Sequence, residues 1–446
     1  MTTSTPQPVT VGIIGAGYVG LTTGVCLGEL GHRVICVDND PEKLALLRRG
    51  TPTIFEPGLE AMMQRNLAAG TLRFTDRIDE AVRESEAIFI CVNTPPKADG
   101  QADLRYVEQV AKEIARALPA DYRVIVDKST VPVRTAEKVA DTIRRYNPRA
   151  KEFDVVSNPE FLREGSAVQD TLNPERIVVG ASTDRARTLM RRVYAPILSR
   201  TSAELCEVSI RSAELIKHGA NSLLATKISF ANLMAEACEA GGADAHEVLH
   251  GIGLDRRIGR EFLRPGIGFG GSCFPKDIAA FRHTLETLGA DASLITAVER
   301  INDHAYQRFL QRIERELWVL DGKRIAILGI AFKANTDDIR NAPAIRLMAA
   351  LGKSGAIVTA YDPQATSKAK RVLPNVRYCA DVYAAADGAE ALVVCTEWDE
   401  FATMDLARLR KAVATPIIFD GRNIIDRAAA QGAGFTYYGV GRATTQ

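Results

Sequence analysis

One glycine-rich stretch near the N-terminus limits the possible fold more than any other feature. The β-branched run at residues 9–14 leads directly into Gly15-Ala16-Gly17-Tyr18-Val19-Gly20. A helical pattern continues through Leu30, and a second apolar run, Arg33–Val37, ends at Asp38. A strand, a glycine turn, a helix and a second strand in this order are typical of the first βαβ unit of a dinucleotide-binding domain.

The spacing inside this unit also indicates the cofactor. Glycines at positions 15, 17 and 20 let the backbone approach a pyrophosphate at the start of a helix. Asp38 follows the second strand, where a carboxylate binds both ribose hydroxyls and repels a 2′-phosphate. The sequence therefore predicts NAD and not NADP. A glycine turn without a ligand is the alternative, and the surrounding strands and helix disfavour it.

Strand and helix patterns alternate through the first 208 residues. This alternation predicts an α/β fold with a doubly wound parallel sheet. Strands are expected at residues 87–92, Arg123–Asp127, 154–157 and Arg176–Gly180, and helices at 104–118 and Thr135–Tyr146.

The remaining chain divides into a helical and a second α/β part. Apolar residues recur at helical spacing over residues 212–240, which predicts one long helix in a mainly helical segment. Runs at 324–329 and 356–362 then repeat the first two strand patterns without the glycine fingerprint, and further strands are expected at 391–395 and 416–420. We predict a flexible tail at 1–8, a Rossmann-like NAD-binding domain at 9–208, a central helical domain at 209–317 and a C-terminal Rossmann-like domain at 318–446.

Composition excludes several classes of function. The 56 basic and 55 acidic residues nearly cancel, so nothing suggests a nucleic-acid or anionic-membrane partner. No run approaches the roughly 20 apolar residues of a membrane span, and the N-terminus lacks a signal-peptide pattern. The eight cysteines form no CxxC pairs, so neither a disulfide framework nor a metal site is expected. We expect reduced thiols and a cytoplasmic protein.

A second glycine-rich segment contains the most reactive candidate side chain. Residues 266–271 hold four glycines, which suit close passage of the backbone past a ligand. Cys273 follows, with Lys276 and Asp277 nearby, a polar setting that favours a nucleophilic thiolate. On these residues alone, a buried structural cysteine behind a tight turn is an equal alternative.

Two further groups of polar residues are candidates for chemistry. Lys217 and Asn221 are four residues apart on the predicted long helix and so share its mainly apolar face. A lysine there is expected to be buried with an anionic partner or a developing oxyanion, although a surface lysine is the commoner case. Glu160 and Glu164 would point the same way if the chain is helical after Pro159; they would activate water, bind hydroxyls or remain solvated acids.

Two loops that follow predicted strands complete the set. Residues 92–96 and 128–132 each come directly after a strand and contain prolines typical of turns. Ligands of open α/β sheets bind at the carboxyl ends of the strands. Both loops are therefore expected to line the cofactor crevice.

Together these motifs resemble the UDP-glucose 6-dehydrogenase family, a branch of the nucleotide-sugar dehydrogenases that also include GDP-mannose dehydrogenase. The resemblance covers the whole chain after the tail, and its motifs are residues 15–20, 158–165, the Lys217/Asn221 helix, 266–277, Phe332-Lys333 and Asp420-Gly421-Arg422. It implies an NAD domain, a central dimerisation domain and a C-terminal domain that binds the UDP part of a nucleotide sugar.

The resemblance also implies a reaction: the four-electron oxidation of UDP-glucose at C6 to UDP-glucuronate, with two NAD reduced per sugar. Cys273 would form a thiohemiacetal and then a thioester. Lys217 or Asp277 would move the first proton, Lys217 and Asn221 would stabilise the oxyanion, and Glu160, alone or with Thr130, would activate the hydrolytic water.

The family's binding residues map onto matching positions of this chain. The implied cofactor contacts are Gly15, Gly17, Tyr18, Val19, Gly20, Asp38, Lys43, Thr94, Pro95, Ser129, Thr130, Glu164, Lys276 and Arg340. The implied substrate contacts are Glu160, Phe161, Leu162, Arg163, Glu164, Lys217, Asn221, Arg257, Phe262, Leu263, Arg264, Gly268, Phe269, Gly270, Phe332, Lys333 and Arg422. Arg257 matches a position that reaches the substrate of the neighbouring subunit, which implies a homodimer or larger homo-oligomer.

Three other functions remain open. GDP-mannose 6-dehydrogenase, or another nucleotide-sugar dehydrogenase, would perform the same chemistry on a different sugar. A two-electron 3-hydroxyacid dehydrogenase also presents a lysine and an asparagine one helical turn apart, but it needs neither the cysteine nor a second α/β domain. A non-catalytic nucleotide-binding protein would keep the fold alone.

Overall fold

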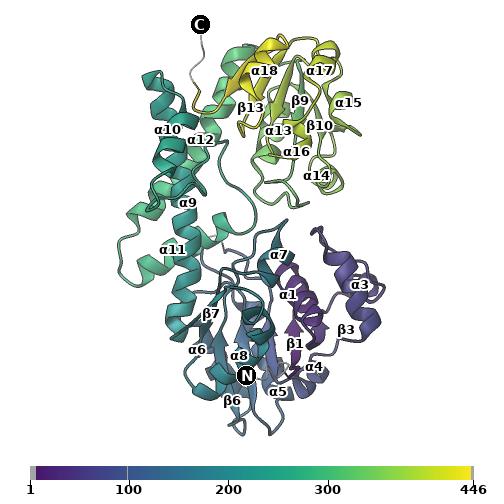
Figure 1. The fold of residues 1–446 in the computed structure, drawn as a ribbon, viewed down its shortest axis with the longest axis vertical. Coiled ribbons are helices and arrows are strands. Elements are labelled where there is room, and N and C mark those ends of the chain that lie inside the picture. Colours follow the sequence, from purple (N-terminus) through teal and green to yellow (C-terminus); the bar gives the residue numbers. More distant parts are fainter. Residues whose placement is uncertain (1–6, 98, 443–446) are drawn as a thin grey trace. The chain divides into compact units, whose positions relative to one another are not determined.

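The structure is a computed structural model that describes residues 7–97 and 99–442. Six residues of the expected tail, 1–6, lie outside this described part. The chain forms two compact units (Figure 1). The N-terminal unit comprises Met1–Ala220 and Ala279–Thr287, and the C-terminal unit comprises Asn221–Ile278 and Leu288–Gln446. The boundaries fall within or at the end of two helices, Ile210–Gly241 and Phe274–Thr287.

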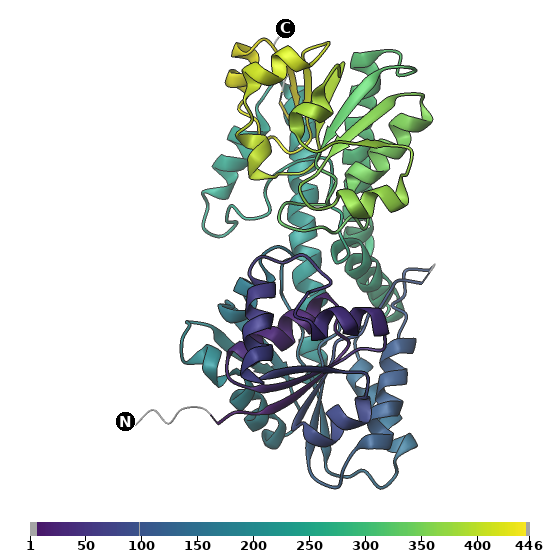
Figure 2. The same ribbon diagram turned by 90° about the vertical axis from the view of Figure 1, so that its right-hand side faces the viewer.

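The N-terminal unit is built on an eight-stranded sheet in the order β3-β2-β1-β4-β5-β6-β7-β8 (Figure 2). Its strands are β1 (Thr10–Ile14), β2 (Arg33–Val37), β3 (Leu72–Thr75), β4 (Ala87–Ile90), β5 (Arg123–Asp127), β6 (Phe153–Ser157), β7 (Arg176–Gly180) and β8 (Glu204–Val208). Neighbouring strands are parallel except for β6 and β7, which are antiparallel. An antiparallel neighbour needs no crossover helix, and the connection here contains only the six-residue α7.

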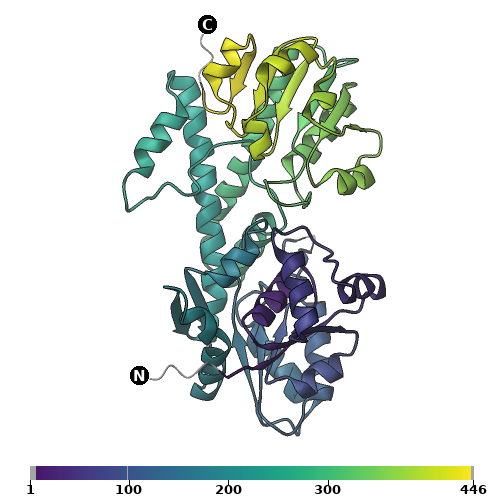
Figure 3. The ribbon, with the colours of Figure 1, turned by 45° about the vertical axis from the view of Figure 1, so that its right-hand side comes forward.

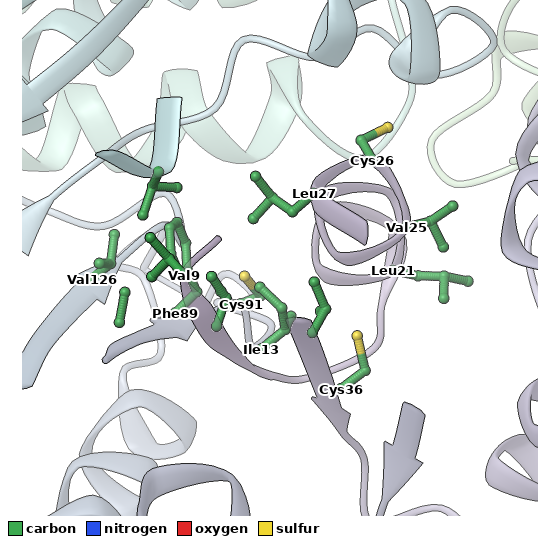
Figure 4. Packing of buried hydrophobic residues seen from close by; sticks show 14 of the residues in the cluster. Val9, Ile13, Leu21, Val25, Cys26, Leu27, Cys36, Phe89, Cys91 and Val126 are labelled. Atoms are coloured by element: carbon green, nitrogen blue, oxygen red, sulfur yellow. The ribbon is translucent and has the colours of Figure 1, made fainter. Parts of the chain in front are cut away.

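Helices cover both faces of this sheet, as a doubly wound fold requires. They are α1 (Tyr18–Glu29), α2 (Pro41–Arg48), α3 (Leu59–Ala69), α4 (Ile78–Glu84), α5 (Arg105–Ala117), α6 (Thr135–Tyr146), α7 (Ala167–Leu172) and α8 (Asp184–Leu198). Adjacent residues of β1 point to opposite faces: Ile13 packs in the core that contains α1, and Ile14 in the core that contains α5 and α6. Figure 4 shows Leu27 of α1 on the side of the helix that faces the strand residues Val9 and Ile13 of the first core.

Four helices follow the first sheet. They are α9 (Ile210–Gly241), α10 (Ala245–Gly253), α11 (Phe274–Thr287) and α12 (Ser293–Leu317). The predicted long helix is confirmed as the continuous 32-residue α9. Among the described residues, no helix is long and apolar enough to cross a membrane.

The C-terminal unit contains a parallel six-stranded sheet in the order β11-β10-β9-β12-β13-β14 (Figure 3). Its strands are β9 (Arg324–Leu328), β10 (Ile357–Tyr361), β11 (Arg377–Tyr378), β12 (Ala391–Val394), β13 (Ile417–Asp420) and β14 (Thr436–Gly439). The helices are α13 (Pro343–Lys353), α14 (Thr366–Val372), α15 (Val382–Ala386), α16 (Asp399–Ala402), α17 (Leu406–Ala412) and α18 (Arg427–Gly432). They form one core on each face of the sheet.

The predicted repeat of the first strand pattern is supported by local geometry. Gly329 has a φ of 90°, close to the 98° of Gly15 at the end of β1. Asp362, after β10, accepts the N–H groups of Ile330 and Ala331 at 2.7 and 3.0 Å. Asp38 accepts the Ala16 N–H in the same way. Both sheets therefore begin with a strand, a tight turn and an aspartate that holds the turn.

Candidate active site

The three fingerprint glycines have separate structural roles. Gly15 has a positive φ, and a Cβ there would lie 2.8 Å from the Cys91 carbonyl oxygen. A Cβ at Gly20 would lie 1.9 Å from the Gly15 oxygen, so this glycine lets α1 approach the turn. A Cβ at Gly17 would meet no atom within 4 Å, which leaves open space beside the first turn of α1, where Tyr18 and Val19 lie. This arrangement fits a bound pyrophosphate.

The Asp38 carboxylate, directly after β2, is fixed by three contacts. Its Oδ2 accepts the Ala16 N–H at 3.0 Å and pairs with Lys43 Nζ at 2.5 Å. Its Oδ1 accepts the Asp40 N–H at 3.2 Å. A fixed carboxylate beside the glycine turn suits the adenosine ribose of NAD, so the residues present fit this cofactor.

The loops after β4 and β5 are tied to each other. The Thr94 hydroxyl donates to the Thr130 carbonyl at 2.9 Å, and the Ser129 hydroxyl donates to the Val92 carbonyl at 2.8 Å. Pro95 also lies in the first loop, where its carbonyl accepts the Asp103 N–H at 2.8 Å. These contacts bring the two loops together at the carboxyl end of the sheet; their role in binding the cofactor remains a prediction.

Lys217 is buried and paired with Glu160. The Lys217 ammonium lies 3.0 Å from Glu160 Oε1, and both side chains are at most 7% exposed. The Phe161 ring lies beside the pair, with its centroid 5.4 Å from Lys217 Nζ and 4.1 Å from the Arg176 guanidinium. The predicted anionic partner of the lysine is therefore a specific carboxylate.

The segment that carries Glu160 is not helical, contrary to the condition under which Glu160 and Glu164 would share a helix face. The helix α7 begins only at Ala167. Glu160 Oε2 accepts the Leu162 N–H at 2.6 Å, a local bond that competes with helix formation. Glu164 is buried, whereas Arg163 is exposed and pairs with Asp170 at 2.7 Å.

A polar cluster in the C-terminal unit surrounds Asp277. Its Oδ2 accepts Asn221 Nδ2 at 2.7 Å, and its Oδ1 accepts Lys276 Nζ at 2.6 Å. Half-buried Cys273 immediately precedes α11, and its carbonyl accepts the Asp277 N–H at 2.8 Å. The N-terminus of α11 carries the positive end of the helix dipole, which favours a thiolate at Cys273. The sequence analysis did not predict this contribution.

The glycines before Cys273 also pack closely against protein, a second reason for glycine at these positions. A Cβ at Gly266 would lie 2.8 Å from the Gly421 oxygen, and one at Gly270 would lie 2.2 Å from the Asn341 oxygen. At Gly271 it would meet the Phe332 ring at 2.7 Å. These glycines are needed because other segments of the same unit pack directly on the loop.

Arg422 joins three segments of the C-terminal unit. Its guanidinium donates to the carbonyls of Cys395, Gly268 and Phe332 at 2.9, 3.3 and 3.2 Å. Lys333 lies 5.7 Å from the Phe332 ring centroid. Arg422 therefore links segments that, by the family resemblance, are predicted to contact the nucleotide sugar.

Other predicted contact residues lie in this unit as well. Phe262 and Phe269 pack on the Phe274 ring, with centroids 6.3 and 5.7 Å away. Leu263 is buried, and Arg264 is exposed. The exposed Arg340 and Arg257 pair with Asp338 and Asp255, both at 2.6 Å. Their roles in binding remain predictions.

The sequence analysis did not identify two buried glutamates of the N-terminal unit, Glu56 and Glu214. Glu56 contacts the Tyr18 hydroxyl and accepts backbone N–H groups of residues 165 and 167. Glu214 accepts the Arg134 and Ala136 N–H groups at the start of α6, at 2.7 and 3.0 Å. No local motif marks either residue, because their partners are distant in the sequence.

Comparisons with known proteins agree with this architecture. Three domains of the UDP-glucose/GDP-mannose dehydrogenase family match the chain: the NAD binding domain at residues 9–198, the central domain at 211–304 and the UDP binding domain at 326–427.

No cluster of three or more metal-binding side chains occurs in the described part of the chain.

Similar proteins match nearly the full length. UDP-glucose 6-dehydrogenase of Rhizobium meliloti (strain 1021) is 44% identical over 96% of this chain and 99% of its own. UDP-glucose 6-dehydrogenase TuaD of Bacillus subtilis (strain 168) is 42% identical over 97% of this chain and 93% of its own. A UDP-glucose dehydrogenase structure from Pyrobaculum islandicum has a TM-score of 0.91 and 39% identity, covering 98% of this chain and 99% of that chain. The chain therefore belongs to the UDP-glucose/GDP-mannose dehydrogenase family and is an NAD-dependent dehydrogenase.

Proposed function

We propose that the protein is a UDP-glucose 6-dehydrogenase that converts UDP-glucose into UDP-glucuronate. The observation that carries the four-electron chemistry is half-buried Cys273 at the start of α11, next to the Asp277 cluster. A two-electron dehydrogenase needs no such thiol. The choice of sugar rests on the UDP-glucose 6-dehydrogenases that match nearly the whole chain.

The first oxidation takes a proton from the C6 hydroxyl and a hydride from C6, which leaves an aldehyde. NAD, when bound, supplies the hydride acceptor for each of the two oxidations. Lys217 and Asp277 are the two proposed proton carriers. The structure holds each in place, Lys217 by Glu160 and Asp277 by Asn221 and Lys276. pH–rate profiles of Lys217→Met and Asp277→Asn discriminate between them, because only loss of the proton carrier removes its ionisation from the profile.

The second oxidation requires the thiol. The Cys273 thiolate forms a bond to the aldehyde carbon, and the carbonyl electron pair moves onto oxygen to give a thiohemiacetal. We propose that Lys217 and Asn221 stabilise this oxygen as donors. Loss of a hydride from the same carbon then leaves a thioester.

Hydrolysis completes the reaction. We propose that Glu160, alone or with the Thr130 hydroxyl, takes a proton from water as the water attacks the thioester carbon. The carbon–sulfur bond breaks and Cys273 is regenerated as a thiolate. The new carboxylic acid loses its remaining proton to solvent, and the sugar leaves as a carboxylate. The adjacent Lys217 ammonium supports Glu160 as an anion before it accepts the proton.

We propose that the protein acts as a homodimer or larger homo-oligomer. Large apolar side chains at helical spacing on α9 are exposed: Leu223 is 64%, Phe230 42% and Leu233 47% accessible. Exposed apolar stripes of this kind favour a protein partner. The predicted role of Arg257 toward a neighbouring subunit makes a second copy the proposed partner.

We also propose a cytoplasmic location. All eight cysteines are free, which suits a reducing compartment, and Cys273 must remain a thiol for the proposed chemistry. Fractionation of source cells with compartment markers tests this proposal.

Counting NADH tests the function directly. Purified protein is incubated with limiting UDP-glucose and excess NAD, and NADH is compared with sugar consumed. Two NADH per sugar are expected because the alcohol loses two hydrides. One NADH per sugar contradicts the four-electron reaction. Parallel reactions with GDP-mannose and UDP-N-acetylmannosamine test the sugar, and turnover of either without turnover of UDP-glucose overturns that assignment.

A further inference from the structure

The Glu56 carboxylate joins three segments of the N-terminal unit. It lies in the loop between α2 and α3 and is only 6% exposed. One oxygen contacts the Tyr18 hydroxyl and accepts the Gly165 N–H at 2.7 Å, and the other accepts the Ala167 N–H at 2.7 Å. Gly165 N–H also reaches the Tyr18 oxygen at 3.0 Å. One side chain therefore connects the fingerprint helix to the segment that carries Glu160 and Glu164.

The charges in this network are consistent with a fixed assembly. Burial, with the neighbouring Glu56 carboxylate, raises the pKa of the Tyr18 phenol, so its hydroxyl remains a donor. Three donors then share the two oxygens of Glu56: one hydroxyl and two backbone N–H groups. A carboxylate is the only side-chain group of this size that offers acceptors on both oxygens and no donor.

We infer that Glu56 is a positioning residue, which holds the segment at residues 160–167 in register with the dinucleotide-binding turn. This inference rests on the proposed function, in which Glu160 activates the water that hydrolyses the thioester. Glu56 touches neither Glu160 nor the fingerprint glycines in the described contacts; it acts through Tyr18 and through the backbone of Gly165 and Ala167.

Substitution of Glu56 is expected to affect cofactor binding and the hydrolytic step together. Glu56→Gln replaces one acceptor oxygen with an NH₂ group, which must face a buried donor. We expect a rise of about 10-fold in KM for NAD and a slower kcat, with sugar trapped on Cys273 in acid-quenched samples. Glu56→Asp keeps both acceptors and is expected to recover part of the loss.

Asn66→Ala provides the matched control. Asn66 is also buried in the N-terminal unit, and its side chain donates to the Val25 carbonyl of α1 at 2.7 Å, away from the Tyr18 end of that helix. The Asn66→Ala substitution removes a buried hydrogen bond to α1, so this variant measures the effect of general destabilisation. We expect both variants to melt earlier than the unaltered protein, while only Glu56→Gln changes KM for NAD and traps the covalent sugar.

Two results overturn the inference: unaltered KM and kcat in Glu56→Gln, or the same kinetic changes in Asn66→Ala at equal loss of thermal stability. Direct titration of both variants with NAD alone, followed by calorimetry, needs no sugar turnover. If the unaltered protein fails to oxidise UDP-glucose, the proposed function fails, whereas the NAD titration still decides whether Glu56 supports the dinucleotide turn. Equal NAD affinity in Glu56→Gln and the unaltered protein contradicts the inference in that case too.

Discussion

Individual side chains determine which chemistry this fold carries out. Cys273 has a thiol at the start of a 14-residue helix, and Asp277 in the first turn of that helix is held by Asn221 and Lys276. Lys217 is neutralised by Glu160, so its ammonium is buried without being left uncompensated. Asp277 and Lys217 therefore each have a partner that fixes the orientation of the side chain.

Replacing the thiol tests the covalent step. Cys273→Ser is expected to reduce turnover of UDP-glucose by at least about 1,000-fold, because a serine hydroxyl is far less ionised than a thiol. NAD affinity should remain within about two-fold of the unaltered protein, since Cys273 is not among the predicted dinucleotide contacts. Steady-state NADH production and NAD titration are the measurements.

Cys379→Ser is the control for that variant. Cys379 is also a half-buried free cysteine of the C-terminal unit, and burial raises the pKa of its thiol. Its replacement should leave turnover unchanged. Full turnover by Cys273→Ser would show that no covalent sulfur intermediate is needed.

Asp38 is expected to determine the preference for NAD. In Asp38→Ser the ribose loses its carboxylate partner, and Lys43, which pairs with Asp38 at 2.5 Å, becomes available to a 2′-phosphate. KM for NAD should rise by about 10-fold or more, and the ratio of kcat/KM for NADP over NAD should increase. Asp40→Ser is the control. Asp40 caps α2 by accepting the N–H groups of residues 42 and 43, and serine is also a good N-cap residue, so this variant should keep the helix intact. An unchanged cofactor ratio in Asp38→Ser would contradict this role.

At the next level, buried polar side chains fix how strands and helices are joined. His32, just before β2, accepts the Val9 N–H at Nδ1 (3.1 Å). Its Nε2 lies 2.9 Å from the Val193 carbonyl of α8 and, with Nδ1 accepting, must be the donor. One neutral imidazole therefore links Val9, the residue before β1, to α8, and protonation would place a second ring N–H against the N–H of Val9.

This link predicts a pH dependence of stability. Burial lowers the pKa of His32 below its ordinary value of about 6.5, so the unfolded chain takes up the proton first as the pH falls. The contribution of His32 is complete above about pH 6.5 and declines below it by at most about 1.4 kcal/mol per pH unit until the folded protein is also protonated.

Urea unfolding between pH 7.5 and 5 measures the effect. His32→Asn does not titrate in this range and is expected to be less stable at pH 7.5, but to lose less stability than the unaltered protein as the pH falls. Parallel losses in the two proteins would show that His32 does not contribute.

Along the chain, four helices follow the first sheet and precede the second, and the proposed active form contains more than one copy. Arg257 is 88% exposed in the single chain and is held by Asp255 in the same turn. An exposed guanidinium that Asp255 already orients can bind an anionic group of a neighbouring subunit.

Mixed oligomers test whether Arg257 serves a partner's site. Arg257→Ala alone should reduce kcat/KM by about 10-fold or more, from loss of a charged contact. Co-expression of Arg257→Ala and Cys273→Ser chains under different tags should restore about a quarter of the unaltered activity in the mixed pool, since half the dimers then hold one intact site. Activity that equals the mean of the two separate variants would place Arg257 in the site of its own chain.

Local patterns were sufficient to predict most elements and several site residues. The glycine turn and Asp38 were predicted from spacing within one βαβ unit, the loops after β4 and β5 from their position after predicted strands, and Lys217 and Asn221 from helical periodicity. The strands β3, β8, β11 and β14 were missed because each is short or lies at or near a sheet edge, where alternation is weak. The antiparallel direction of β7 relative to β6 was not predicted either, because it depends on the short connection between the two strands and not on the residues of β7.

Only the tertiary structure decided which groups meet. Glu160 becomes the partner of Lys217, and Glu56 the partner of Tyr18 and Gly165, across separations of 57, 38 and 109 residues. The glycines before Cys273 were predicted to pass a ligand, and packing against Asn341 and Phe332 adds a requirement for glycine that the local sequence did not indicate. Local sequence records the conformation of a segment through its own sterics and polarity; which distant surface covers that segment depends on how the whole chain folds.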